Sequence, residues 1–202
     1  MITTIIFDLG GILVPEAGNS IQQGMAMYLA IPQTELAAFT SPLKARLTTG
    51  EITLHELYDS LAKSRGLSLT ADDMLNQHFE LYKQHQTARD ARILNLVEKL
   101  KLDYNVPCLT NTEKEIAEYN KQHGLFAFFH KAFISTDMGM KKPDVGIYRA
   151  VIKELGCRHA DAIFIDDNPD YIQGARNAGI DSILYKGFEQ LTQKLTSYGV
   201  RF

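Results

Sequence analysis

Hydrophobic residues are spaced in two different ways along this chain of 202 residues. The apolar run of residues 5–14 begins as a short buried strand that ends at Asp8, and two glycines follow, where the backbone must turn sharply. From about residue 17 to 84, apolar residues recur only at helical spacing, as in the stretch that begins at Leu54. We therefore expect one strand followed by a group of helices.

Polar residues indicate where these helices begin. A Ser, Thr or Asp followed three residues later by Glu or Gln is typical of a capping box, in which side chains bind the free backbone amides of the first turn. Pro42 and Gly50 interrupt the helical pattern, which predicts a break and a turn between helices. The capping pattern begins at four residues: Ser20, Thr53, Thr112 and Asp170.

After about residue 88 the pattern alternates between helix and strand. Strands separated by helices of ordinary length predict right-handed βαβ units and a parallel sheet. The predicted fold class is α/β, with a Rossmann-like parallel-sheet core (1–14 and 85–202) and a small α-helical cap (15–84) inserted after the first strand. The later predicted strands cover residues 105–109, 132–135, 162–165 and 182–184.

Composition narrows the class of protein. Hydrophobic residues make up 45% and charged residues 22%, as in ordinary soluble globular proteins. A net charge of -3 leaves no basic patch and weighs against a nucleic-acid partner. No apolar stretch approaches the roughly 20 residues of a membrane span, and the N-terminus lacks the cationic region of a secretory signal. Cys108 and Cys157 lack metal-ligand spacing, so we expect a reduced cytoplasmic protein with Cys108 in its core. The sequence does not indicate an oligomeric state.

Side chains with chemical function follow four of the predicted strands. Because the carboxyl ends of parallel strands meet at one edge of a sheet, we expect these side chains to converge. Three carboxylates would not gather without a cation, since like charges at short range oppose one another's ionisation. Oxygen ligands without His or Cys suit Mg²⁺, which readily shares a phosphate. The residues are Asp8 after the first strand, Thr110 and Asn111 after the second, Lys142 in the loop after the third, and Asp166 and Asp167 after the fourth.

The same convergence indicates phosphoryl chemistry. A lysine near a hydroxyl and an amide can hold phosphoryl oxygens. Asp8 is then placed as a nucleophile that forms an aspartyl-phosphate, which water hydrolyses. We interpret the chain as a Mg²⁺-dependent hydrolase acting on a small phosphorylated metabolite.

Four motifs at these strand ends resemble the haloacid dehalogenase superfamily, in the branch whose helical cap follows the first strand. The resemblance covers essentially the whole chain, and it is strongest to small bacterial sugar-phosphate phosphatases related to α-glucose-1-phosphate phosphatase. Each motif alone is a weak signal, whereas four in order at strand ends are a strong one. They read Phe7-Asp8-Leu9-Gly10-Gly11, Leu109-Thr110-Asn111-Thr112, Gly139-Met140-Lys141-Lys142-Pro143-Asp144 and Phe164-Ile165-Asp166-Asp167-Asn168.

For the metal, the resemblance implies four residues. Asp8 would be both the nucleophile and a ligand of Mg²⁺, and the backbone carbonyl of Gly10 would be a second ligand. Asp167 would be the main ligand from the last motif, with Asp166 either binding the ion or supporting it.

For the substrate, the resemblance implies three residues. Thr110 and Asn111 would grip the phosphoryl group, and Lys142 would neutralise charge on Asp8 and on the phosphate. The implied activity is hydrolysis of a small phosphomonoester, with sugar phosphates among the candidates.

Gly10 departs from the pattern of the family. Most of its phosphatases carry a second aspartate two residues after the nucleophile, which protonates the leaving oxygen and then activates the hydrolytic water. Acid–base help of this kind is worth about 10²–10⁴-fold in rate. The sugar-phosphate branch also tends to carry glycine here, so we expect slow hydrolysis of alkyl phosphates and faster hydrolysis of activated ones. Tyr171, where relatives often carry asparagine, is a second departure.

Two other functions are possible on the same scaffold. A 2-haloacid dehalogenase would use Asp8 without a metal, but Asp166 and Asp167 would then repel its carboxylate substrate. A catalytically weak binding or regulatory protein would account for Gly10. Dependence of turnover on Mg²⁺ separates the first alternative, and ligand binding without turnover would mark the second.

Few residues of the cap can be assigned. Arg46 and the turn at Gly50 and Glu51 could meet a polar substrate, although solvent exposure is the simpler interpretation. His55 and His78 lack a partner at metal-ligand spacing, so we expect both at the surface or at a boundary.

Overall fold

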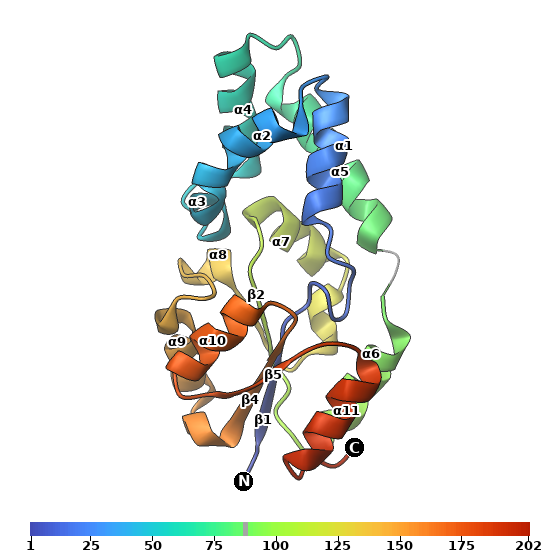
Figure 1. Ribbon diagram of the computed structural model, residues 1–202, viewed down its shortest axis with the longest axis vertical. Coiled ribbons are helices and arrows are strands. Elements are labelled where there is room, and N and C mark those ends of the chain that lie inside the picture. Colours follow the sequence, from blue (N-terminus) through green and yellow to red (C-terminus); the bar gives the residue numbers. More distant parts are fainter. Residues whose placement is uncertain (87–88) are drawn as a thin grey trace.

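The computed structural model describes residues 1–86 and 89–202, and one half of it is built on a five-stranded parallel sheet (Figure 1). Its strands are β1 (Thr4–Phe7), β2 (Cys108–Thr110), β3 (Ala132–Ile134), β4 (Ala162–Asp166) and β5 (Asp181–Leu184). They lie in the order β3-β2-β1-β4-β5, so the first strand of the chain is the centre of the sheet. This arrangement confirms the predicted α/β class with a parallel, Rossmann-like sheet.

Helices cover both faces of this sheet because the central strands are apolar on both sides. The helices are α6 (Ala91–Leu100), α9 (Val145–Leu155), α10 (Pro169–Asn177) and α11 (Phe188–Ser197). Ile5 and Phe7 of β1 belong to one apolar cluster with residues of α6 and α11, whereas Ile6 belongs to a second with residues of α9 and α10. In Figure 1, α9 and α10 lie on the left of the sheet and α6 and α11 on the right. Cys108 is fully buried in the first cluster, as predicted.

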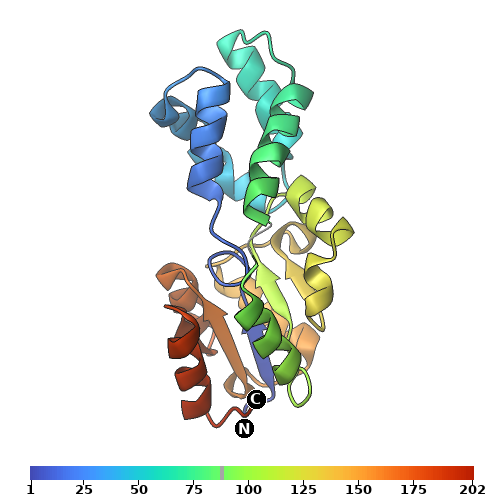
Figure 2. The same ribbon diagram turned by 90° about the vertical axis from the view of Figure 1, so that its right-hand side faces the viewer.

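The other half of the molecule consists of helices that pack on one another above the sheet (Figures 1 and 2). They are α1 (Gly18–Tyr28), α2 (Gln33–Thr40), η1 (Ser41–Leu43), α3 (Lys44–Thr48), α4 (Leu54–Arg65) and α5 (Ala71–Gln86). Their buried residues form a third apolar cluster, which includes Met25, Leu57 and Met74. The chain enters this half after β1, at the waist of the molecule (Figure 2), and the next described helix of the sheet half is α6.

Short elements above β2 and β3 join the two halves. α7 (Lys114–Gln122) follows β2 and contributes Ile116 to the apolar cluster of the helical half. α8 (Ser135–Met138) follows β3 and contacts α3. The turn after α3 lies against α8, since a Cβ atom added to Gly50 would be 3.1 Å from the Thr136 carbonyl oxygen. The 3-10 turns η2 (Leu125–Phe128) and η3 (His159–Asp161) precede β3 and β4.

Both ends of the chain lie at the far end of the sheet from the helical half (Figures 1 and 2). The amino group of Met1 lies 3.2 Å from Asp161 Oδ1, which holds the first residues against the start of β4. Within the described part of the chain, none of the helices has the length and apolar character needed to span a membrane.

One of the four predicted capping boxes forms. At the start of α4, the Glu56 amide donates to Thr53 Oγ1 at 3.1 Å, and the Thr53 amide donates to Glu56 Oε2 at 2.8 Å. The prediction at Ser20 was wrong, because α1 already begins at Gly18 and has no side-chain cap.

The other two predicted boxes were also wrong. Glu113, not Thr112, is the residue before α7, and its side chain makes no capping bond. α10 begins one residue before Asp170, at Pro169, which has no amide hydrogen to satisfy. Asn168 therefore caps this helix by accepting the Asp170 amide at 2.9 Å.

Candidate active site

The carboxyl ends of the central strands meet at the waist, below the helical half. Asp8 directly follows β1, Thr110 ends β2 and Asp166 ends β4. Lys142 lies in the loop between α8 and α9 and reaches the same point. The convergence predicted from the strand ends is therefore present in the structure for these residues.

Lys142 is a buried ammonium between two carboxylates. Its Nζ lies 2.8 Å from Asp8 Oδ1 and 2.7 Å from Asp166 Oδ2. Burial alone would lower the pKa of Lys142, but the two carboxylates outweigh it and the pKa is raised. The ammonium also lies 4.7 Å from the centroid of the Tyr171 ring, within cation–π range. Lys142 thus keeps its charge, and Tyr171, whose consequence the sequence did not indicate, forms one wall around it.

Asp166 has both of its carboxylate oxygens engaged. Oδ2 accepts from Lys142, and Oδ1 accepts the backbone amide of Asn168 at 2.8 Å. Burial and the charge of Asp8 raise the pKa of Asp166 to about 7, against the opposing effect of Lys142. Of the two roles left open by the sequence, direct binding of a metal or support, these contacts favour support.

Asp8, Asp166 and Asp167 form the cluster that could hold a metal ion. One carboxylate oxygen from each lies within 4.8 Å of the others. Burial, Asp8 and Glu16 raise the pKa of Asp167, which is the effect of crowded negative charge that a divalent cation relieves. The donors are all oxygens, as Mg²⁺ prefers. The residues present therefore fit a magnesium ion.

Gly11 makes room for Asp167 in this cluster. Its φ of +67° is in the left-handed region that glycine adopts at little cost. A Cβ atom at this position would lie 1.9 Å from Asp167 Oδ2, a distance that excludes any other residue while Asp167 stays in place. Gly10, just before it, lines the same cavity as Asp8 and Asp167, so its backbone lies at the site where the resemblance predicted a carbonyl ligand.

Thr110 and Asn111, the predicted phosphoryl-binding residues, have different surroundings. Thr110 is buried and lines the cavity beside Asp8. Asn111 uses its side-chain amide to hold the loop of Lys142: Oδ1 accepts from the Lys142 amide, and Nδ2 donates to the Lys142 carbonyl oxygen, both at 2.9 Å. Asn111 thus positions the catalytic lysine candidate, a role that the sequence did not indicate, and its contact with phosphate stays a prediction.

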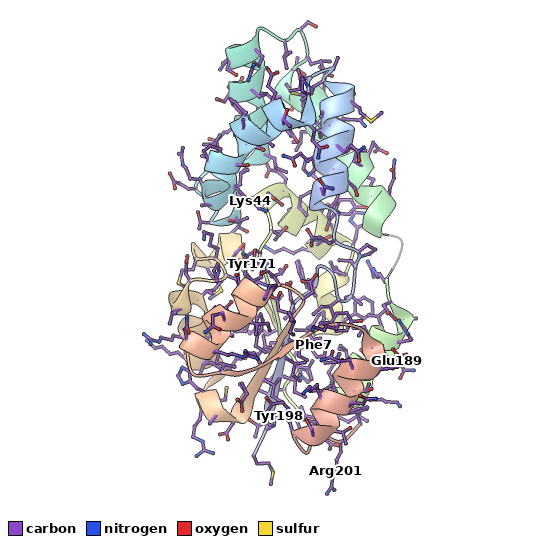
Figure 3. The ribbon with its side chains drawn as sticks, viewed as in Figure 1. Phe7, Lys44, Tyr171, Glu189, Tyr198 and Arg201 are labelled. Atoms are coloured by element: carbon purple, nitrogen blue, oxygen red, sulfur yellow. The ribbon has the colours of Figure 1, made fainter. Side chains whose placement is uncertain are left out.

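A cavity of about 820 Å³ extends from this cluster toward the helical half. Apolar residues of the helices, among them Met25, Leu36 and Leu57, line its upper part. Lys44 of α3 lines it as well, and Figure 3 labels Lys44 above Tyr171, on opposite sides of the waist. Polar side chains and apolar surface together would suit an organic molecule that carries a charged group.

Lys44 was not among the candidates from the sequence, which were Arg46 and the turn at Gly50 and Glu51. Arg46 and Glu51 are exposed and form an ion pair, with Arg46 Nε 2.7 Å from Glu51 Oε1. Solvent exposure, the simpler interpretation, is therefore correct for both. Lys44 and Arg46 are two residues apart on one helix, so their side chains point in different directions. The sequence alone does not show which of these directions leads to the cavity.

Of the two histidines expected at the surface or at a boundary, His55 is exposed and His78 is buried. The prediction for His78 was wrong: its Nδ1 lies 2.7 Å from the Tyr58 hydroxyl, and both residues line the upper cavity. Burial lowers the pKa of His78 to about 4. The sequence did offer one indication of this burial: His78 lies four residues after the apolar Met74, and residues four apart share one face of a helix. Met74 is buried in the structure.

Comparison with known proteins identifies relatives over the whole chain. The family model of haloacid dehalogenase-like hydrolases matches residues 5–185. D-ribitol-5-phosphate phosphatase from Bacteroides thetaiotaomicron is 22% identical over 97% of this chain and 98% of its own length. Drimenol cyclase drtB from Aspergillus calidoustus is 29% identical over 98% of this chain, which spans only 36% of that longer protein.

Solved structures show the same fold. A predicted hydrolase of the haloacid dehalogenase-like family from Porphyromonas gingivalis superposes with a TM-score of 0.80 at 22% identity, over 100% of both chains. An enzyme of the same family from Bacteroides thetaiotaomicron, in complex with magnesium and inorganic phosphate, has a TM-score of 0.76 at 21% identity. That comparison covers 92% of this chain and 95% of the other.

Proposed function

We propose that this chain, which belongs to the haloacid dehalogenase-like hydrolases, is a Mg²⁺-dependent phosphatase that hydrolyses a small phosphomonoester through an aspartyl-phosphate. The observation that carries the proposal is Lys142, buried between Asp8 and Asp166 beside the three-acid cluster. Relatives named as phosphatases, and a structural neighbour that holds magnesium and phosphate, support it.

Asp8 is the proposed nucleophile. Lys142 holds its Oδ1, which leaves Oδ2 to attack phosphorus while the bond between phosphorus and the ester oxygen breaks. The buried ammonium offsets the negative charge that Asp8 and the phosphoryl group bring together. Water then hydrolyses the aspartyl-phosphate and restores Asp8.

Asp8, Asp167 and the Gly10 carbonyl would hold Mg²⁺, with Asp166 in support through Lys142 and Asn168. When bound, the ion would neutralise phosphoryl oxygens and orient them toward Asp8. Thr110 and Asn111 would contact the remaining phosphoryl oxygens from the end of β2.

Residues 15–84 would act as a cap that covers the site and selects the organic part of the substrate. The cavity is larger than a phosphate group needs, and its upper wall comes from helices of this segment. A sugar phosphate is one substrate that we propose for this space. Closure of the cap over the substrate would exclude water from the reacting phosphoryl group.

A screen of phosphorylated metabolites with and without Mg²⁺ tests the proposal. We expect phosphate release that requires Mg²⁺ and that disappears in Asp8→Asn, which keeps the shape of the side chain but removes the nucleophilic charge. Release of halide from a 2-haloacid without Mg²⁺ would identify a dehalogenase instead. Ligand binding without any turnover in saturating Mg²⁺ would identify a binding or regulatory protein.

A further inference from the structure

Because residue 10 is glycine, the proposed reaction lacks the carboxylate that would protonate the leaving oxygen and then activate water. We infer that Glu16, eight residues after Asp8, supplies this carboxylate and is the general acid–base of the enzyme. The inference rests on the proposed phosphatase function and names one further catalytic residue for it.

The loop after β1 brings Glu16 back to Gly10. A backbone bridge joins Gly10 to Val14, so the chain returns to the start of the loop just before Glu16. A Cβ atom added to Gly10 would lie 3.0 Å from Glu16 Oε2. An aspartate at position 10 would extend its carboxylate from that Cβ atom. The Glu16 carboxylate therefore borders the space that the missing group would occupy.

Glu16 also lacks the contacts of a structural residue. Its side chain is exposed and lines the cavity with Asp8 and Asp167. Within residues 1–86 and 89–202, its carboxylate makes no ion pair or hydrogen bond to a side chain or backbone group. Its charge helps to raise the pKa of Asp167, which places it near the acid cluster. This carboxylate is therefore free to contact a substrate or water in the cavity.

The proton transfers balance with Glu16 in this role. As Asp8 attacks phosphorus and the ester bond breaks, protonated Glu16 gives its proton to the leaving oxygen, which departs as an alcohol. The Glu16 carboxylate then takes a proton from water, whose oxygen attacks the phosphorus of the aspartyl-phosphate. The bond between phosphorus and Asp8 breaks, inorganic phosphate leaves, and Glu16 is protonated again.

Glu113 is the rival acid in the same cavity. It lies at the N-terminal end of α7, and burial raises its pKa. The positive charge of Lys44 acts against this rise in the pKa of Glu113. Glu113 is not among the residues near a Cβ atom added to Gly10. The two acids can be separated by substituting each one alone.

The first experiment compares Glu16→Gln, Glu113→Gln and Glu51→Gln on an alkyl phosphate. Glu51 is the matched control, because it is exposed and pairs with Arg46 away from the cavity. We expect kcat of Glu16→Gln to fall roughly 100-fold or more while KM changes little. Glu51→Gln should retain the wild-type kcat, and Glu113→Gln should not reproduce the loss seen in Glu16→Gln. Thermal unfolding should be unchanged in Glu16→Gln, and its Mg²⁺ affinity in calorimetry should equal that of the wild type.

The second experiment uses an aryl phosphate, whose phenolate leaves with little need of a proton. We expect Glu16→Gln to release the phenol in a burst and then to stop turning over, because water is no longer activated to hydrolyse the aspartyl-phosphate. Acid quenching followed by mass spectrometry should detect the phosphorylated chain, which a purely structural substitution would not accumulate.

The third experiment restores the carboxylate at its usual place. Gly10→Asp in the Glu16→Gln background should recover part of the lost kcat on the alkyl phosphate, since no positive φ opposes a side chain at Gly10.

Four results would overturn the inference. They are a wild-type kcat in Glu16→Gln, the same defects in Glu113→Gln instead, weaker Mg²⁺ binding as the main effect, and no recovery in the double variant. A wild-type chain without phosphatase activity would remove the proposed function itself, and this inference with it.

Discussion

Two adjacent glycines at the site serve different purposes. Gly11 has a positive φ, and Asp167 lies directly against it, so both conformation and contact require glycine. Gly10 has neither constraint, and a side chain there would meet only the flexible end of Glu16. At the level of single residues, Gly11 therefore places a proposed metal ligand, whereas Gly10 leaves space for another acid.

This difference predicts the effect of Gly11→Ala. The new methyl group must displace Asp167, so we expect Mg²⁺ affinity in calorimetry to fall roughly 10- to 100-fold. Gly66→Ala is the matched control: φ is +61° there, and nothing lies within 4 Å of the added Cβ atom. Both variants should lose about 1 kcal/mol of stability from the left-handed backbone. Equal Mg²⁺ affinities in the two would contradict the assigned place of Asp167.

The residues at strand ends were predictable, and those on loops and helix faces were not. Asp8, Lys142 and Asp166 could be expected to meet, because parallel strands deliver their carboxyl ends to one edge. Glu16 and Lys44 reach the cavity through a loop reversal and a helix orientation, and neither leaves a periodic signal in the sequence.

Among the secondary-structure elements, apolar runs predicted the strands well, and polar signals predicted the helix starts poorly. The strand expected at 162–165 is observed as Ala162–Asp166. The strand expected at 105–109 is shorter at its start, because Pro107 has no amide hydrogen to give to the sheet. A capping box forms only if the helix begins directly after its Ser, Thr or Asp. At three of the four predicted boxes, the box does not form at the predicted residue.

The one capping box that forms should be measurable. Thr53→Ala removes the oxygen that accepts the Glu56 amide, so we expect a loss of about 1 kcal/mol in the free energy of unfolding by urea. Ser20→Ala, at a predicted box that does not form, should change stability little. A larger effect at Ser20 than at Thr53 would contradict the observed helix starts.

His78 of α5, which contacts Tyr58 of α4, makes the free energy of unfolding depend on pH. Burial holds the pKa of His78 at about 4, against an ordinary value of 6.5. Between these values the unfolded chain binds a proton that the folded chain does not, so stability falls as pH falls from 6.5 toward 4. At pH 5 the loss from this residue should be about 2 kcal/mol.

Urea unfolding at pH 7 and pH 5 would measure this loss. His78→Gln should show a smaller decrease between the two pH values than the wild type, since it removes the titrating ring. His55→Gln, at an exposed position, should behave as the wild type. Parallel pH dependence in all three proteins would show that another group is responsible.

In the molecule as a whole, the helical half supplies one wall of the cavity and the sheet supplies the other. Lys44 is a cation that this half brings to the cavity, whereas Arg46 pairs with Glu51 outside it. We expect Lys44→Gln to raise KM for an anionic substrate up to about fivefold, with little change in kcat. Arg46→Gln is the control and should leave KM unchanged. Steady-state kinetics of both variants on one substrate would decide, and an equal rise in KM would contradict the assignment.

The positions of Met1 and Phe202, far from the helical half, have a practical consequence (Figure 1). An affinity tag or a surface tether attached at either terminus would lie across the length of the sheet from the cavity, which residues at the carboxyl ends of the strands line. Immobilised protein should therefore bind small molecules as freely as protein in solution, whichever end is anchored.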